Sequence, residues 1–268
     1  LIKKYPKRFS FYLDKFSNLK KIIKLGIKAN AIIFDLGVSS YQLLDNKRGF
    51  SFKSKEKLSM QMGINKYSAY EVVNNFDKMN LTKIIKILGE EKDGKLIANR
   101  IVQYREKKTI ETAEELSTII NKAKKNYNNY KKNPATKTFQ AIRIFVNHEL
   151  TELILGLIAA TEILVNGGIL VVVSFHSLED KIVKNFFNFY SNLNKNPSRY
   201  LPKAENISGF FKTQSKKPLM PTAKEIEKNY SSRSAKLRYA VRNNNNFFYP
   251  TEIYQKFENY FKLQELTI

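Results

Sequence analysis

A short apolar run that ends in a polar turn decides the organisation of the chain: residues 29–34 read Ala-Asn-Ala-Ile-Ile-Phe, and residues 35–40 continue Asp-Leu-Gly-Val-Ser-Ser. An apolar run of this length before a glycine-containing turn is typical of a central strand that is covered on both faces of an α/β sheet. Ligands of open α/β sheets bind outside the carboxyl ends of the strands. The turn that begins at Asp35 is therefore the first candidate for a functional site.

Strand and helix patterns alternate on both sides of this run. Before it, the alternation in residues 8–16 predicts a short strand, and Ser17 is placed to cap a helix that ends at Gly26. After it, the patterns predict a long helix or helix pair at 136–164, a strand at 168–174, a helix at 181–190, a strand at 236–241 and a helix at 251–266. This order indicates an α/β protein, most simply a parallel sheet with helices on both faces.

Residues 54–133 differ from the rest because they carry helical patterns and no convincing strand. The helical patterns lie at 81–88, 95–107 and 113–127. Thr112, with Glu115 three residues later, has the form of a capping box. We therefore predict an inserted helical subdomain at 54–133 within a discontinuous α/β domain made of residues 1–53 and 134–268.

The composition excludes several kinds of site and favours one kind of partner. The 268 residues include 47 Lys and Arg against 24 Asp and Glu, a net charge of +23, and no cysteine. A disulfide scaffold, a thiolate zinc site, an iron–sulfur cluster and a cysteine nucleophile are thereby excluded, and we expect no metal. The positive charge favours a polyanion such as nucleic acid. Lysines that simply cover a solvated surface would give the same count.

The most apolar stretch, residues 153–175, does not predict a membrane helix. Glu162 interrupts it, the Asn-Gly-Gly at 166–168 ends a helix, and residues 169–173 are mostly β-branched. The stretch reads instead as a helix, a turn and a buried strand, and we expect no membrane partner.

A second polar turn follows the strand predicted at 168–174 and begins Phe-His-Ser at residues 175–177. We expect it to emerge beside the Asp35 turn, from a neighbouring strand. The imidazole of His176, with a reference pKa of about 6.5, is suited to relaying a proton. His148 is expected to lie within a helix and is interpreted as structural.

Four blocks of sequence resemble one known family when they are taken together. They are residues 35–43 (Asp-Leu-Gly-Val-Ser-Ser-Tyr-Gln-Leu) with 48–52 (Arg-Gly-Phe-Ser-Phe), residues 134–144 (Pro-Ala-Thr-Lys-Thr-Phe-Gln-Ala-Ile-Arg-Ile), residues 174–180 (Ser-Phe-His-Ser-Leu-Glu-Asp) and residues 233–238 (Arg-Ser-Ala-Lys-Leu-Arg). Over essentially its whole length the chain resembles the bacterial ribosomal small-subunit (16S) rRNA cytosine-N4 methyltransferase family. The resemblance implies a class I, Rossmann-like methyltransferase sheet with an inserted helical subdomain. It also implies S-adenosylmethionine as cofactor, and as substrate the N4 amine of a cytidine in the decoding region of small-subunit rRNA, in the cytoplasm.

The resemblance carries three cofactor contacts over to this chain, at Phe16, Asp35 and Gln42. An aromatic ring at Phe16 can stack on adenine, the carboxylate of Asp35 can hold a polar group of the cofactor, and Gln42 can hydrogen-bond through either end of its amide. In the family, a glycine-rich loop and an acidic residue precede the point at which this chain begins. We therefore expect the sheet to lack its first strands and the affinity for the cofactor to be weakened.

The implied reaction is direct methyl transfer to an amine, which needs no enzyme nucleophile. Ser39, Ser40 and the backbone between Gly37 and Ser40 are candidate acceptors for the amine protons, and His176 is the candidate proton relay. Tyr41 and Phe175 flank the two turns and could stack on a flipped base. The cations expected to contact RNA are Arg48, Lys137, Arg233, Lys236 and Arg238.

Two local departures and two rival functions accompany this interpretation. Asn133 stands where the family usually has His, and Ser59 where it usually has Asp. One rival is a catalytically incompetent, basic RNA-binding fragment or decayed member of the family. The other is a DNA amino-methyltransferase, which the absence of an Asp/Asn/Ser-Pro-Pro-aromatic tetrapeptide disfavours.

Overall fold

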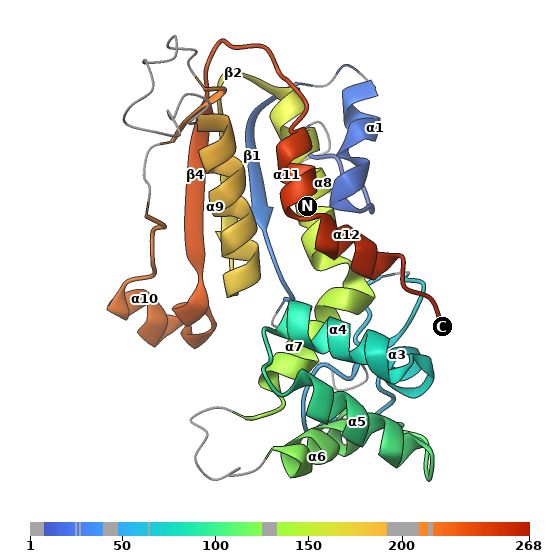
Figure 1. Cartoon of the computed structure of the whole chain (residues 1–268). Coiled ribbons are helices and arrows are strands. Elements are labelled where there is room, and N and C mark those ends of the chain that lie inside the picture. The colour runs from blue at the N-terminus through green and yellow to red at the C-terminus, as the bar shows by residue number, and fades with distance from the viewer. Residues whose placement is uncertain are drawn as a thin grey trace, which may run out of the picture.

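The computed structural model describes residues 8–24, 26, 28–39, 48–63, 65–124, 133–191, 209–213 and 217–268. In these ranges the chain forms a four-stranded sheet with helices packed against it and a group of helices beyond one end of the strands (Figure 1). The architecture confirms the predicted α/β, Rossmann-like fold class.

The sheet is mixed, with the strand order β1-β2-β4-β3. Its strands are β1 (Ala29–Asp35), β2 (Leu164–Ser174), β3 (Phe211–Thr213) and β4 (Lys236–Arg242). β1 and β2 are parallel, but β4 is antiparallel to both β2 and β3. The prediction of a wholly parallel sheet is therefore wrong at β4. Between β3 and β4 the chain turns back at one end of the sheet without crossing it, and such a direct return makes the two strands antiparallel.

β1 lies at the edge of the sheet, and in the described part of the chain its two faces differ. Phe34 is buried on the face that meets the helices, whereas Ile33 on the other face is 69% exposed, as is Ile169 of β2 at 40%. The predictions of a doubly covered central strand and of helices on both faces are therefore wrong for the described residues. An apolar run alone does not distinguish a strand buried on one face from one buried on both.

The strand predicted at residues 8–16 is also wrong. Residues 8–15 have no regular structure, and residues 11–13 are exposed. A 3₁₀ turn, η1 (Phe16–Asn18), then leads into α1 (Leu19–Lys24). The aromatic alternation meets no partner strand in the described residues, so it has no sheet face to cover.

The remaining helices follow the predicted order, with three differences. They are α3 (Ala69–Asn75), α4 (Lys78–Gly89), α5 (Gly94–Arg105), α6 (Ala113–Ala123), α7 (Thr136–Asn147), α8 (Glu149–Ile163), α9 (Ser177–Ser191), α10 (Ala223–Lys228), the 3₁₀ turn η4 (Tyr230–Ser234), α11 (Thr251–Lys256) and α12 (Glu258–Gln264). The capping box at Thr112 is confirmed. The Thr112 side chain accepts a hydrogen bond from the Glu115 N–H at 3.1 Å, and the Glu115 carboxylate accepts one from the Thr112 N–H. The sequence did not predict α3 and α10, and the closing helix is interrupted at Phe257.

The segment predicted as a long helix or helix pair is the pair α7 and α8. They are separated at His148, whose φ of +57° is a left-handed value that breaks the helix. Among the described residues no single helix is long and apolar enough to cross a membrane. α7 and α8 reach that length and composition only together, and they are bent by 52°. Both are largely buried within the protein.

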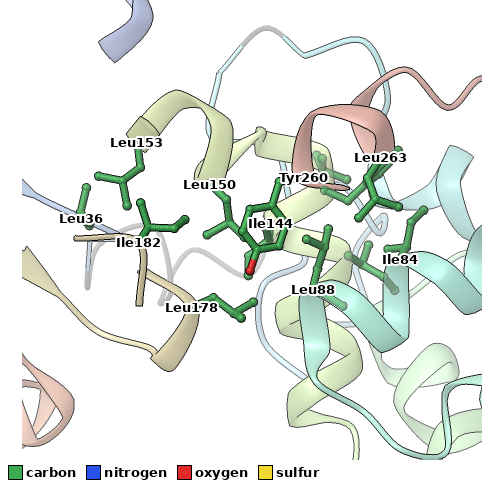
Figure 2. Packing of buried hydrophobic residues seen from close by; sticks show 14 of the residues in the cluster. Leu36, Ile84, Leu88, Ile144, Leu150, Leu153, Leu178, Ile182, Tyr260 and Leu263 are labelled. Atoms are coloured by element: carbon green, nitrogen blue, oxygen red, sulfur yellow. The ribbon is translucent and has the colours of Figure 1, made fainter. Parts of the chain in front are cut away.

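One hydrophobic core runs from the sheet into the helices α3 to α6, which we call the helical block (residues 69–123). Figure 2 shows the row of buried side chains that joins the two parts through Leu36, Leu153, Ile182, Leu150, Ile144, Leu88 and Ile84. Because these side chains share one core, the block is held against the carboxyl end of the sheet. The predicted domain boundaries at residues 53/54 and 133/134 stay a prediction.

His148 is expected to make stability depend on pH. Burial lowers its pKa below the usual 6.5, although a hydrogen bond with Gln264 opposes the shift. A lowered pKa means that the folded protein favours the neutral ring. This stabilisation is fully present above the unfolded pKa of about 6.5 and is lost as the pH falls through the lower folded pKa. Since water screens this partly exposed ring, we expect a loss of less than about 1 kcal/mol, or roughly 2 °C in melting temperature, between pH 7.5 and 5.5.

The His148→Asn variant isolates this effect, because asparagine tolerates the left-handed conformation and does not titrate. Melting curves of both proteins at the two pH values measure it. An equal change with pH in the variant and the parent would show that His148 is not responsible.

Candidate active site

The two predicted turns lie side by side at the carboxyl ends of β1 and β2. Asp35 is the register partner of Val173, and the Leu36 N–H extends the pairing by donating to the Val173 carbonyl at 3.0 Å. Gly37 follows with a φ of +88°, and a Cβ at this position would lie 3.6 Å from the ring of Phe175. Glycine is favoured here because L side chains rarely adopt this φ. The expectation that the Asp35 and His176 turns emerge together from neighbouring strands is confirmed.

His176 caps the first turn of α9 together with Glu179. The Nδ1 atom of His176 accepts a hydrogen bond from the Glu179 N–H at 3.4 Å, and the Glu179 carboxylate accepts the N–H groups of His176 at 3.3 Å and Phe175 at 2.8 Å. The arrangement is a capping box with histidine in the place of serine or threonine. In neutral imidazole, an Nδ1 that accepts places the proton on Nε2.

The Nε2 atom of His176 is buried beside the same carboxylate. It lies 3.2 Å from Glu179 Oε1, but the geometry is not that of a hydrogen bond, so the contact is electrostatic. Burial raises the pKa of Glu179, but His176, the Phe175 N–H and the charge of Arg143 together lower it below its ordinary value. Nε2 of His176 is therefore buried and Nδ1 is engaged in the cap in this conformation.

Arg143 and Glu149 form an ion pair behind this cap. The guanidinium donates to both oxygens of Glu149, at 2.8 and 2.7 Å, where α7 meets α8. Ligand atoms of Glu149, His176 and Glu179 lie within 4.8 Å of one another, a grouping that could in principle hold a cation. Arg143 occupies both oxygens of Glu149 and backbone N–H groups occupy Glu179 Oε2, so most of the possible ligand atoms of this cluster are already engaged.

A second carboxylate at the start of α9, Asp180, joins this helix to β4. Arg238 donates to it at 2.7 Å and Lys236 at 3.2 Å. Burial raises the pKa of Asp180, but the hydrogen bonds and charges of Arg238 and Lys236 outweigh that effect and lower it. Both cations were expected to contact RNA. The structure places them in this ion-pair cluster, with Arg238 only 8% exposed.

The turn between α4 and α5 joins the helical block to the same loop. Ser177 Oγ donates to the Glu90 carboxylate at 2.7 Å, and Lys137 Nζ donates to the Glu90 carbonyl at 2.9 Å. Glu90 has a φ of +48°, an uncommon conformation for a residue other than glycine. At the neighbouring Gly89, a Cβ would lie 2.6 Å from the Lys137 carbonyl oxygen, so α4 and α7 approach closely only with glycine there.

A buried ion pair supports this turn from beneath. Lys124 Nζ lies 2.5 Å from Glu91 Oε2 with both side chains 5% exposed, and it also donates to the Pro134 carbonyl at 2.9 Å. Lys124 thus fastens the end of α6 both to this turn, through Glu91, and to the segment that precedes α7, through Pro134.

The other predicted site residues differ in how exposed they are and in what they pack against. Asp35 is exposed on the open face of the sheet, on the same side as Ile33, and Ser39 is exposed in the turn. Phe16, 39% exposed, packs edge-on against Phe34 with ring centroids 5.1 Å apart. It rests on α8 at Gly156, where a Cβ would lie 2.7 Å from the Phe16 Cβ.

Three further predicted residues, Arg48, Arg233 and Lys137, lie among the described residues, and two lie outside them. Arg48 is half-buried and its carbonyl accepts the Met60 N–H at 2.8 Å, while Arg233 is exposed within η4. Lys137 is exposed and tethers the Glu90 turn. Ser40 and Gln42 lie outside the described residues. The roles assigned to all these side chains stay predictions.

Comparison with known proteins assigns the chain to a family. Residues 1–243 match the model of the MraW methylase family. The chain belongs to the MraW methylase family. Its turns at Asp35 and His176 are therefore the candidate active site of a methylase.

Similar proteins of this family carry one name. The proteins called "Ribosomal RNA small subunit methyltransferase H" from Sulfurihydrogenibium sp. (strain YO3AOP1) and from Oenococcus oeni are both 43% identical to this chain. The first match covers 90% of this chain and 78% of the relative, the second 88% and 76%. The protein of that name from Borreliella afzelii is 41% identical, over 87% of this chain and 74% of the relative.

Sequence reasoning missed the residues of this MraW-family chain that hold the site together. Glu179 has a signal in the sequence, because its position three residues after His176 is the capping-box spacing. Glu90 and Glu91 carried no sequence signal, because their partners lie 87 and 33 residues away. Only the fold brings these pairs together.

The Glu90→Gly variant should separate the fixing of the α9 cap from overall stability. Glycine relieves about 1 kcal/mol of backbone strain and loses a hydrogen bond of similar worth, so the melting temperature should change little. The amides of Phe175 and His176, no longer fixed through Ser177, should exchange roughly fivefold faster. Amide hydrogen exchange resolved by residue measures this difference.

Glu90→Gln is the matched control, because its amide oxygen still accepts from Ser177. It should exchange like the parent at these amides. Unchanged exchange in Glu90→Gly would mean that the helical block does not hold the cap.

Proposed function

We propose that this chain transfers a methyl group from S-adenosylmethionine to the N4 amine of a cytidine in the decoding region of small-subunit rRNA. The observation that carries the proposal is the adjacency of the Asp35 and His176 turns at the carboxyl edge of β1 and β2, where α/β folds bind ligands. Membership of a methylase family and relatives named for small-subunit rRNA support the choice of reaction and substrate. We place the reaction in the cytoplasm, on rRNA or on the small subunit.

The residues on this edge fit the proposed cofactor. Asp35 presents a carboxylate beside exposed apolar surface, and the ring of Phe16 is partly open at the edge of β1. A carboxylate and an aromatic ring suit a ligand that carries positive charge and an adenine. We propose Asp35, Phe16 and Gln42 as its contacts. When bound, S-adenosylmethionine supplies a methyl group on a positively charged sulfur, an electrophile that requires no enzyme nucleophile.

The chain's own task is then to orient and activate a weak nucleophile. The cytosine amine reacts poorly because its lone pair is delocalised into the ring. We propose that Ser39, Ser40 and the carbonyls of the Gly37 to Ser40 turn accept hydrogen bonds from the amine protons, which localises the lone pair, and that the proton released passes to water. Holding the amine in line for transfer contributes on the order of 7–11 kcal/mol in favourable cases.

We propose that His176 acts by holding this turn in place. Its Nδ1 caps α9 and its Nε2 is buried against Glu179, so the ring would have to leave the cap before it could take a proton. A fixed cap in turn fixes Phe175, whose ring lies beside Gly37 of the Asp35 turn.

Methyl transfer with a labelled donor tests the proposal. Small subunits isolated from cells lacking the modification should gain about one labelled N4-methylcytidine per particle. The Asp35→Ala variant should lose 100-fold or more in kcat/KM, about 3 kcal/mol of transition-state stabilisation. If the chain bound the subunits but labelled no cytidine amine, it would be a basic RNA-binding module and the proposal would be wrong.

The same assay distinguishes the two roles of His176. Asparagine is a good N-cap but cannot relay a proton, so His176→Asn should keep kcat within about tenfold of the parent. Alanine removes the cap at a cost of about 1 kcal/mol and should be slower than asparagine. A loss of 10²–10⁴-fold in both variants would instead identify His176 as a general base.

A further inference from the structure

The segment between β3 and β4 forms an exposed arm at the same edge of the sheet as the two turns. We call residues 217–234 the α10 arm. It leads directly into Lys236, whose register partner is Ser174 at the end of β2. In Figure 1 the arm lies at the foot of β4, across the carboxyl end of the sheet from the helical block. Any RNA strand that enters the candidate site from this side must pass it.

The arm has a defined structure although most of it is exposed. Leu219 pairs with Leu237 through two backbone hydrogen bonds of 2.8 and 2.9 Å, and Thr222 caps α10 by accepting from the Glu225 N–H at 3.2 Å. Ser232 is buried and donates to the Asn229 carbonyl at 2.8 Å. The side chains on η4 are therefore presented from an ordered backbone.

η4 presents one aromatic ring with a cation held on it. Tyr230 is 69% exposed, and the guanidinium carbon of Arg233 lies 4.2 Å from its ring centroid. Arg233 is fixed there by a hydrogen bond of 3.1 Å to the Tyr230 carbonyl. An exposed tyrosine ring with an arginine beside it presents a flat aromatic surface and a positive charge. Proteins use these two features to bind unpaired bases without reading their sequence.

We propose that the Tyr230–Arg233 pair is a stacking platform for an unpaired RNA base next to the methylated nucleotide. The proposal rests on the function proposed above, since a base must leave its stack to be methylated, and its neighbours then need new stacking partners. The guanidinium lies within reach of the phosphate beside that base. Charge alone is a weak basis for RNA binding by the arm, because Lys217, Lys224 and Lys228 are partly offset by Glu225 and Glu227.

A fluorescence experiment tests the platform directly. The chain contains no tryptophan, so Tyr230→Trp introduces a single reporter at the proposed site. Tyr249→Trp is the matched control, because Tyr249 is likewise exposed, at 50%, but follows the opposite end of β4. A twelve-nucleotide unstructured RNA of adenosine and cytidine should quench the reporter at 230 and leave the one at 249 nearly unchanged. Equal or absent quenching at the two positions would overturn the proposal.

Binding of the same RNA by two further variants gives a second readout. Tyr230→Phe keeps the ring and should bind within about twofold of the parent, whereas Tyr230→Leu keeps bulk without a π-face and should bind about tenfold more weakly. Equal affinity of the leucine variant would exclude stacking. Neither measurement requires methyl transfer: quenching at 230 without labelling of a cytidine would refute the proposed function alone, and labelling without quenching would refute the platform alone.

Discussion

The parallel pairing of β1 with β2 is the constraint on which the rest of the structure depends. Residues 29–35 and 164–174 are separated by more than a hundred residues, yet their register brings Asp35 opposite Val173. Everything that follows these two strands, the Gly37 turn on one side and the Phe175–His176 turn on the other, must emerge at the same edge. The long connection between β1 and β2 contains the helical block. The parallel pairing of these strands therefore positions both the site and the helices next to it.

Three residues in the first turn of α9 then connect this edge to the rest of the protein. Ser177 binds Glu90 of the helical block, Glu179 holds the cap and faces the Arg143–Glu149 pair, and Asp180 binds Arg238 and Lys236 of β4. The contacts of Glu179 and Asp180 are largely buried, where such interactions are stronger and an unpaired group is costly, whereas the Ser177–Glu90 hydrogen bond is exposed. The first turn of α9 is thus fixed from three directions, which is the kind of rigidity that orientation of a substrate requires.

The sequence predicted those parts of the fold that depend on residues close together in the chain. The apolar run before Asp35, the capping box at Thr112 and the β-branched run of β2 each combine a residue pattern with a chemical stop signal, and all three are confirmed. The direction of β4 and the exposed face of β1 were predicted wrongly, because neither depends on the segment's own residues but on which neighbours the chain supplies. Aromatic alternation at residues 8–16 misled for the same reason.

For the candidate site, the sequence found the turns but not the forces that hold them. Lys236 and Arg238 are motif residues that were assigned to RNA from their charge, and the structure shows both bound to the Asp180 carboxylate. A cation's partner can be many residues away, so charge in a motif does not by itself distinguish a ligand contact from a brace. The same holds for His176, whose position at a strand end suggests a proton relay. Its Nδ1 instead accepts a hydrogen bond from the N–H of Glu179, three residues further along the chain.

The register of β1 against β2 can be measured directly, because the chain has no cysteine of its own. Ile33 and Val171 are register partners, so their Cα atoms should lie about 4.8 Å apart, within disulfide range, whereas Ile33 and Ile169 should be about 8 Å apart and out of range. On mild oxidation the Ile33→Cys/Val171→Cys protein should form an internal disulfide and the Ile33→Cys/Ile169→Cys protein should not. The reverse result, or none in either protein, would contradict the pairing that brings the two turns together.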